Sequence, residues 1–434
     1  MIFGFFLVCL FTDMGAISDT PRSMDLSEWV SAALSSSPEI RSSEASVISA
    51  RASLTGDQAF LYPSLTASAG VTRAWSNSPL PDEGSVRSET DSWSAGLSLS
   101  QEILRSGGQN WLYRNASRLE FAAAEADHEG AVLQVTLDVV YAYYDVIEAI
   151  KLRQAAENSL ERTRGQLART QALYDMGAVT TLELLQVQVQ ESEDRLLAGR
   201  REQALQTAYG NLYIAAGADL SGPVMLVDTN AVLEPLPMES VALIPGDHSQ
   251  NQSLRAARFR QEASGIRADA AGRSYWPTLR ASAGWNWNDD TLDDIDRMFD
   301  SHGYNVGLSL SWTVFDGFLR ESQIKSSRAA EISSQASLES LEDQLASTER
   351  TLRTTLELDV RYYRDSMLAL ERAQEQYRLS SMSYDMGAIS LLDLLDAQSD
   401  LASAEANLAG ARVAALKTEA SLMVLLGNPP RLGE

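Results

Sequence analysis

Cysteine and histidine are nearly absent from this sequence. One cysteine, Cys9, and three histidines, His128, His248 and His302, stand in 434 residues. They lie far apart in the chain, so they match no disulfide framework, no zinc-ligand spacing and no pairing of a nucleophile with a histidine base. This inventory argues against an enzyme, and it predicts neither a cofactor nor a metal site.

Positive charge is also scarce. The chain has 35 Lys and Arg residues against 59 Asp and Glu residues, and its formal net charge is -24 at pH 7. A surface that binds phosphate needs a concentrated basic patch, and the sequence contains none. We therefore expect no nucleic acid among the partners.

Long apolar runs are missing as well. After residue 18, no stretch approaches the roughly 20 apolar residues that a membrane-spanning helix needs. The short apolar run at residues 2–11 is followed by Ala16-Ile17-Ser18, a small-x-small pattern typical of a cleaved export signal. Although no Lys or Arg precedes the run, the pattern predicts a signal peptide over residues 1–18.

What the sequence does contain is a duplication. The run Tyr-Asp-Met-Gly-Ala occurs at residues 174–178 and again at 384–388, a spacing of 210 residues. The duplication predicts a first repeat over residues 25–217 and a second over 248–427, each with a helix, two strands and a long helical hairpin. Residues 218–247 are rich in proline and form a linker or equatorial segment, and residues 428–434 form a C-terminal tail.

The strands are indicated by period-two alternation of apolar and polar residues. It covers residues 65–72 and 93–100 in the first repeat, and 279–288 and 306–313 in the second. Polar loops are expected between them, over residues 76–92 and 288–305. Alternation alone fits both a transmembrane sheet and a soluble sheet with one wet face. Five tryptophans in or next to these windows fit the aromatic belt of a membrane protein: Trp75, Trp93, Trp285, Trp287 and Trp312.

The helices are expected to be long. Helical patterns run over residues 25–61, 108–174, 181–216, 249–273, 317–384 and 391–426. The two longest contain no proline and would each extend on the order of 100 Å, which is typical of coiled coils. One chain offers too few helices to bury such long apolar seams, so the pattern predicts a symmetric oligomer.

The turn of each hairpin carries capping signals. Gly177 and Gly387 suit the left-handed position after a helix. Thr180 with Glu183, and Ser390 with Asp393, fit the capping box at the start of the next helix. A capped turn explains these residues but not Asp396, which lies on the same helix face as Asp393. The two carboxylates therefore carry a second interpretation, in which symmetry-related copies converge on an axis.

Taken together, these elements resemble the TolC family of outer-membrane efflux ducts over nearly the whole chain. The matching segments are Phe60-Leu61-Tyr62-Pro63-Ser64-Leu65, residues 96–101 and 307–317, both hairpin turns, and Leu392-Asp393-Leu394-Leu395-Asp396-Ala397-Gln398. The resemblance implies a mainly α fold with a small transmembrane β part. In it, long coiled-coil helices form an α-barrel continuous with a trimeric 12-stranded β-barrel, to which each chain gives four strands.

The resemblance also implies a function. The protein would be a homotrimer in outer-membrane lipid, extending into the periplasm, and the passive exit duct of a tripartite efflux or type I secretion system. A periplasmic adaptor and an inner-membrane pump would dock at the hairpin tips, which open like an iris. The alternative is a periplasmic adaptor or coiled-coil scaffold without a pore, which the two complete hairpins disfavour.

Site residues follow from the same resemblance. The channel constriction would be formed by Asp393, Asp396, Glu183 and Tyr384. The adaptor would engage the tips at Met176, Gly177, Ala178, Met386, Gly387 and Ala388. The chain departs from the family pattern at Ile389, where a basic residue can help to latch the tip, so closure is expected to depend more on packing.

Overall fold

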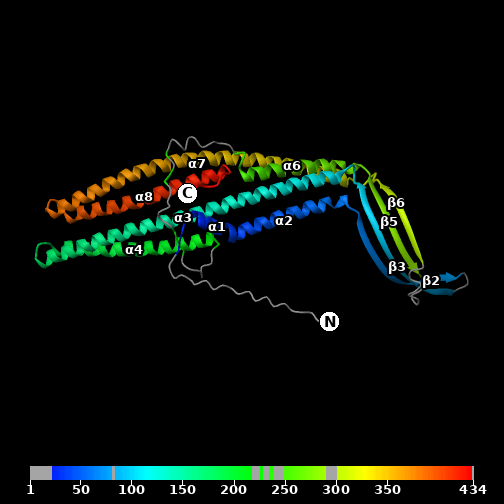
Figure 1. The fold of residues 1–434 in the computed structure, drawn as a ribbon, viewed down its shortest axis with the longest axis horizontal. Coiled ribbons are helices and arrows are strands. Elements are labelled where there is room, and N and C mark those ends of the chain that lie inside the picture. The colour runs from blue at the N-terminus through cyan, green and yellow to red at the C-terminus, as the bar shows by residue number, and fades with distance from the viewer. Residues whose placement is uncertain are drawn as a thin grey trace.

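The fold is a long ribbon with a β-sheet at one end and two helical hairpins at the other (Figure 1). It is seen in a computed structural model that describes residues 22–80, 84–217, 225–227, 234–235, 237, 248–289 and 301–432. The expected signal peptide lies outside these residues, as does most of the equatorial segment. From that segment the structure describes β4 (Met225–Val227), which pairs in parallel with β1 (Arg22–Met24).

Two helices span most of the ribbon, and shorter helices lie beside them in pairs. The long helices are α3 (Gln109–Asp175) and α7 (Leu319–Asp385), as expected. Beside α3 lie α2 (Pro38–Gln58) and α4 (Thr181–Ala215), and beside α7 lie α6 (Gln252–Gly272) and α8 (Leu391–Leu425). Within the described part of the chain, no helix has both the length and the apolar character that crossing a membrane requires.

The expected single helix over residues 25–61 is wrong. It is divided into α1 (Leu26–Ser36) and α2, because Ser37 adopts ψ 129° and Pro38 begins the next helix. Proline has no backbone N–H and disfavours the helical conformation in the residue before it, but it suits the first turn of a new helix. The break lets α1 turn away from α2 and pack on α3.

The sheet is antiparallel, with the strand order β2-β3-β5-β6. Its strands are β2 (Ser64–Leu80), β3 (Gly84–Leu104), β5 (Thr278–Asp289) and β6 (His302–Ser311). The loop expected over residues 76–92 is wrong, since residues 76–80 and 84–92 are strand and residues 81–83 lie outside the described residues. Of the loop expected over residues 288–305, both ends are strand, and residues 290–300 lie outside the described residues.

The register gives the sheet two different faces. Positions on one face are mostly apolar, as in the row Ala67, Leu97, Trp285 and Tyr304. The middle rows of the other face contain only Ser, Thr, Gly and Asn: Ser64, Ser100, Ser282 and Gly307; Thr66, Ser98, Gly284 and Asn305; Ser68, Gly96, Asn286 and Gly303. Side chains alternate between faces along a strand, so every strand contributes to both.

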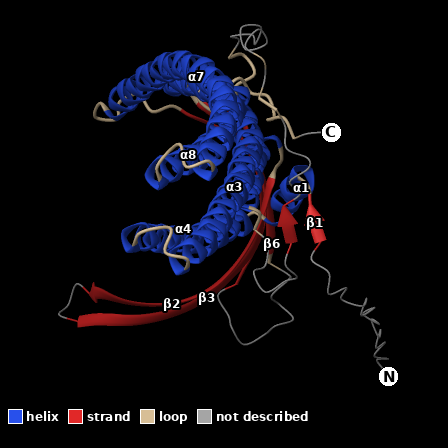
Figure 2. Cartoon of the chain, turned by 90° about the vertical axis from the view of Figure 1, so that its left-hand side faces the viewer, coloured by secondary structure: helices blue, strands red, loops and turns tan. Residues whose placement is uncertain are grey.

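Each strand continues into one helix, and the order of neighbours is kept. β2 follows α2, β3 leads into α3, β5 follows α6, and β6 leads into α7. The helices next to the sheet contact in the order α2-α3-α6-α7, and those at the hairpin end in the order α4-α3-α8-α7. Seen from the hairpin end, the row of helices curves into an open arc (Figure 2). The chain is thus a curved strip with two free edges.

The main hydrophobic core lies at the middle of the strip, where α1 packs against α3 and the far ends of α4 and α8. Trp29 and Tyr143 are fully buried in it, and the Trp29 ring meets Tyr213 edge-on with centroids 5.5 Å apart. This is the only large cluster of buried apolar residues among those described. It ties the first hairpin to the second at the equator.

Tyr144, in this core, makes the protein less stable at alkaline pH. Burial, with the nearby Glu419 carboxylate, raises the pKa of Tyr144 to about 12, whereas an unfolded tyrosine titrates near 10. The folded state therefore holds the Tyr144 proton more tightly than the unfolded state does. The stabilisation of the folded state from this difference is complete below pH 10 and is lost as the pH rises from about 10 to 12. We expect the free energy of unfolding to fall by about 2–3 kcal/mol across that pH range.

The check is thermal unfolding of the purified protein at pH 8 and at pH 11, with Tyr144→Phe as the comparison. The variant should lose less stability than the wild type at the higher pH. Parallel losses in both proteins would contradict the assignment.

Candidate functional site

The two hairpin tips have the same backbone. α3 and α7 each end one residue before a methionine, and Gly177 and Gly387 both have φ 74°. The amide of Ala178 donates to the carbonyl of Leu173 at 2.9 Å, and that of Ala388 donates to Ser383 at 2.8 Å. These bonds close the helix end in a Schellman motif. The exposed residues at each summit are the predicted docking residues, of which Met176 and Met386 are 72% and 74% exposed.

The helices that follow the tips begin differently. At α8 the capping box is complete, because the Ser390 hydroxyl accepts from the Asp393 amide and the Asp393 carboxylate accepts from the Ser390 amide at 3.0 Å. At α4, Thr180 accepts from the Glu183 amide at 3.3 Å, but the return bond to the Thr180 amide is not made. The box predicted at the first tip is therefore only half formed.

The predicted constriction residues have different surroundings. Hydrogen bonds from the hydroxyl and the amide of Ser390 hold the pKa of Asp393 below its usual value. Asp396 lies one turn further along α8 and is exposed. Glu183 and Tyr384 are half-buried, each on its own hairpin. Within one chain the two aspartates share a face of α8, whereas Glu183 is on α4, which is separated from α8 by α3.

A link between the two tips was missed by sequence reasoning. Arg169, near the end of α3, forms an ion pair with Asp385, the last residue of α7. Its guanidinium also lies over the Tyr384 ring, 5.9 Å from the centroid. The first hairpin is thus latched to the second near the tips, without a basic residue at position 389.

Further contacts between α3 and α8 continue from the tips toward the equator. Arg162 approaches Glu405 at 3.7 Å, Lys417 pairs with Asp145, and the Tyr141 hydroxyl contacts Ser421. We call this line of contacts the seam. The two residues of each contact are more than 200 residues apart in the sequence, so no local pattern could have predicted these contacts.

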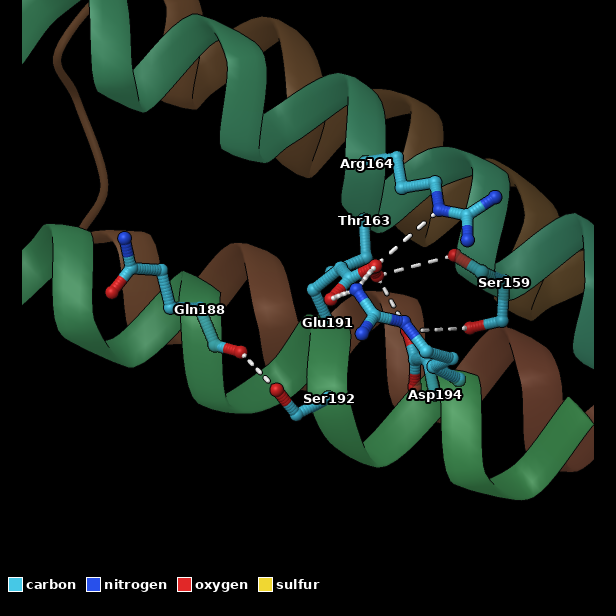
Figure 3. Close-up of polar contacts among 8 residues, drawn as sticks. Ser159, Thr163, Arg164, Gln188, Glu191, Ser192 and Asp194 are labelled. Atoms are coloured by element: carbon cyan, nitrogen blue, oxygen red, sulfur yellow. Dashed lines mark hydrogen bonds and ion pairs between the residues drawn. The ribbon is translucent and has the colours of Figure 1, made fainter. Parts of the chain in front are cut away.

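Below the tips, the seam includes a group of buried polar side chains. Thr163 of α3 donates to Asp194 of α4 at 2.5 Å, and Gln398 of α8 donates to Thr163 at 2.6 Å. Beside them Glu191 accepts from Arg164 and Arg195, and the bond from Arg195 holds the pKa of Glu191 below its usual value. Figure 3 shows the α3 and α4 members of this group, with Gln188 directed away from it.

Exposed aromatic rings gather at two levels of the sheet. One level lies where strands meet helices and includes Trp276 and Trp312, which are 64% and 62% exposed. The other lies further along the sheet at Trp285, which faces Tyr304 across the strand pair. Trp285 of β5 follows Trp276 by nine residues of extended chain, which is about 30 Å in length, or about 23 Å in height at a tilt of about 40°.

The five predicted belt residues differ in exposure. Trp75, Trp285 and Trp312 are exposed, and Trp287 is half-buried and stacks on Trp285 with centroids 5.1 Å apart. Trp93 is 5% exposed and so belongs to the packed part of the sheet.

Both edges of the helical strip present uncovered apolar side chains. On α4 they are Leu182, Leu185, Val189 and Leu196, and on α7 they include Leu358, Tyr362, Leu379 and Met382. Spacings of three and four residues, and of seven or a multiple of seven, place each set on one helix face. Figure 2 shows α4 and α7 at opposite ends of the arc. The sheet repeats this pattern, since β2 and β6 are edge strands.

Known proteins are similar to this chain in sequence and in fold. Outer membrane protein TolC of Vibrio cholerae is 22% identical over 404 residues, which cover 92% of this chain and 90% of TolC. Pyoverdine export outer membrane protein OpmQ of Pseudomonas aeruginosa is 26% identical over 421 residues, covering 93% and 85%. The crystal structure of the Campylobacter jejuni CmeC outer membrane channel superposes with a TM-score of 0.81 at 18% identity, covering 94% and 87%.

The family comparison covers both repeats. The outer membrane efflux protein family matches residues 29–218 and 247–428, which leaves out most of the equatorial segment. The predicted fold class, of long helices with a small antiparallel sheet, is confirmed, and so is the predicted outer-membrane location. With its duplicated hairpins and two-faced sheet, this chain belongs to the outer membrane efflux protein family.

Proposed function

We propose that three copies of this chain form a passive exit duct through the outer membrane, closed at its periplasmic end by the hairpin tips. The observation that carries the proposal is the curved strip with two unlike free edges. Each edge lacks a partner within the chain: β2 and β6 in the sheet, and α4 and α7 at the hairpin end. When the two unlike edges of one subunit fit each other, copies of the subunit join head to tail. They form a closed ring if the rotations from one subunit to the next add up to a full turn.

Three subunits suit the size of the strip. Four strands per chain would give twelve in the closed sheet, and the four helices beside them would give an equally wide helical wall. The unpaired strand edges would then pair between subunits, which removes the exposed edges that otherwise promote aggregation. The apolar faces of α4 and α7 would be covered by the same closure.

The sheet suits the membrane. Its two aromatic levels are about 23 Å apart in height, close to the apolar band of about 25 Å that outer-membrane proteins present to lipid. The face between them bears Leu, Val, Ala and Trp side chains, whereas the opposite face bears hydroxyl and amide groups. The apolar face would contact lipid and the polar face would line the outlet.

The tips suit a gate that a partner opens. Met176-Gly177-Ala178 and Met386-Gly387-Ala388 are exposed at the end farthest from the sheet (Figure 1), where a periplasmic adaptor with its inner-membrane pump would dock. Glu183 and Tyr384 would help to hold the tips closed, and Asp393 and Asp396 would form the acidic ring. No chemical step is needed, because the pump would supply the energy. One relative, OpmQ, serves pyoverdine export, as its name states.

The duct is tested by fractionation and electrical recording. We expect the protein in the outer-membrane fraction, migrating as a trimer that heat converts to monomer, and forming channels in planar bilayers. A soluble periplasmic monomer without channel activity would instead favour the scaffold alternative.

The acidic ring is tested by replacing Asp396 with Asn. Six carboxylates in a narrow ring attract multivalent cations, and Asp396 has no capping role, so its loss should leave folding unchanged. We expect the concentration of La³⁺ that half-blocks the channel to rise roughly tenfold or more. The control is Gln186→Asn, at the matching position of the first repeat. Equal block in the wild type and Asp396→Asn would remove this residue from the ring.

Asp393 needs a different substitution. Its carboxylate completes the cap of α8, so Asp393→Ala would lose the cap as well as the charge, and helix caps contribute about 1 kcal/mol. Asp393→Asn keeps an acceptor for the Ser390 amide and removes only the charge. Comparison of the two variants separates gating from helix stability.

A further inference from the structure

The buried polar group in the seam joins both hairpins. Thr163 of α3, Asp194 of α4 and Gln398 of α8 are 0%, 6% and 4% exposed. The ion pair between Arg169 and Asp385 near the tips differs, because its side chains are 46% and 45% exposed. We call the buried group the polar layer and define it as Ser159, Thr163, Asp194 and Gln398.

A chain of hydrogen bonds in the polar layer leads from Gln398 through Thr163 to Asp194. An ionised Asp194 can only accept, so the single hydroxyl proton of Thr163 is directed to it, at 2.5 Å. The Thr163 oxygen is then free to accept from Gln398 Nε2 at 2.6 Å, and the same amide also donates to the Ser159 carbonyl at 3.1 Å. Both N–H groups of Gln398 are therefore used. Bonds arranged head to tail around a buried charge strengthen one another.

The duplication shows that folding does not require this layer. At the matching positions of the second hairpin, Thr163 is replaced by Ala373, Asp194 by Ala404 and Glu191 by Leu401. These three pack as a small apolar cluster. Gln188, the counterpart of Gln398, is exposed and does not enter the group. At these matching positions the second hairpin thus packs through apolar side chains, so the polar side chains of α3 and α4 in the first hairpin need another explanation.

The layer stands between two kinds of contact. Thr163 lies about 18 Å from the end of α3 at Asp175, and Gln398 about 10 Å from the start of α8 at Leu391. On the tip side, the hairpins are joined by the solvated pair of Arg169 and Asp385. On the equatorial side, the seam continues into the main core. Water can replace an exposed ion pair at little cost, but a buried donor or acceptor that loses its partner keeps the full desolvation penalty.

We propose that Gln398 is a positioning residue that fixes the pivot of gating: the hairpins separate on the tip side of the polar layer, while the layer and the seam beyond it remain joined. The inference rests on the proposed gating of the duct. It predicts that the travel of the second hairpin is limited by one amide side chain, and that removing this side chain lets the separation spread toward the equator.

The test starts from protein whose tips are already released by Arg169→Ala with Asp385→Asn, which we call the tip variant. Single-channel conductance in planar bilayers is compared for the tip variant alone, with Gln398→Leu added, and with Gln188→Leu added. We expect Gln398→Leu to raise the conductance of the tip variant roughly twofold or more, and Gln188→Leu to leave it unchanged. A side chain that only stabilises the fold would alter the thermal stability of the trimer and not its conductance, and that result would overturn the proposal.

Hydrogen exchange gives a readout that does not depend on a pore. In the tip variant, amides of residues 167–175 should exchange fast while those of residues 156–164 stay protected. Adding Gln398→Leu should speed exchange at residues 156–164 by about tenfold or more. If residues 156–164 already exchange as fast as the tips in the tip variant, the pivot is not at Gln398. Absence of channels in the wild type would instead count against the duct, and the exchange result would still decide the pivot.

Discussion

Replacing Gly427 with alanine is expected to abolish the folded protein. Gly427 follows α8 with φ 81°, and an added Cβ would lie 2.1 Å from the carbonyl oxygen of Gln250 and 2.4 Å from its carbon. Both are backbone atoms, so no side-chain rotation relieves the clash. The segment is also held in place, because Asn251 Nδ2 donates to the Leu425 carbonyl at 2.8 Å. We expect the substitution to lower the free energy of unfolding by on the order of 4 kcal/mol or more.

The measurement is the yield of heat-modifiable trimer in outer membranes, and the chain provides its own control. Gly387 has a similar φ of 74° but nothing within 4 Å of the added Cβ. Gly387→Ala should therefore cost only the backbone strain of about 1–2 kcal/mol and leave the trimer present. A bulky residue at position 387 should impair efflux while the protein stays folded. Equal trimer yields for the two alanine variants would refute this distinction.

Loss of the Arg169 side chain is expected to open the closed duct while the trimer persists. The ion pair with Asp385 is exposed and contributes at most about 1 kcal/mol per subunit. If three copies break together, the closed state loses about 3 kcal/mol, which is roughly a hundredfold in the ratio of closed to open channels. Arg169→Ala should thus raise the open probability in bilayers and sensitise cells to large antibiotics that the outer membrane normally excludes.

Two variants make this result specific. Arg164→Ala removes an arginine that pairs with Glu191 inside the first hairpin, so it should leave the open probability unchanged. Exchanging the charges with Arg169→Asp and Asp385→Arg should restore closure. Channels that remain closed in Arg169→Ala would mean that packing alone holds the tips.

Helix ends were predictable from sequence because their causes are local. Gly177 and Gly387 each supply the left-handed residue that closes a helix, and Ser390 with Asp393 forms the predicted cap. The duplication also fixed the order of elements. The break at Pro38 had an equally local signal, but the helical pattern on both sides obscured it.

The length of the first β-hairpin was not predictable from alternation. Between Trp75 and Trp93 its residues are rich in Ser, Asp and Glu, so no apolar period marks the strands there. The strands are held there by cross-strand pairs instead, such as Arg73 with Asp91 at 2.6 Å. Such a pair depends on register, which the sequence pattern does not reveal in a polar stretch.

The links between hairpins were equally hidden. Gln188 and Gln398 occupy the same position in the two repeats, yet only Gln398 is buried. The difference comes from Thr163 and Asp194, which the second repeat replaces with alanines and which become neighbours of Gln398 only in the folded chain. The repeat suggested that the two glutamines are equivalent, but in the folded chain they have different surroundings.

The polar face of the sheet has a consequence for what the protein exports. Its middle rows hold hydroxyls, amides and glycines and no ionised group. In the proposed trimer this part of the outlet would therefore be wettable but without fixed charge or a selectivity filter, and the ion pair of Arg280 with Glu102 in the next row of the same face adds no net charge. A cationic dye, an anionic siderophore and an unfolded polypeptide would meet the same lining. Discrimination among cargoes would then take place before the outer membrane is reached, and one outlet could serve several pumps.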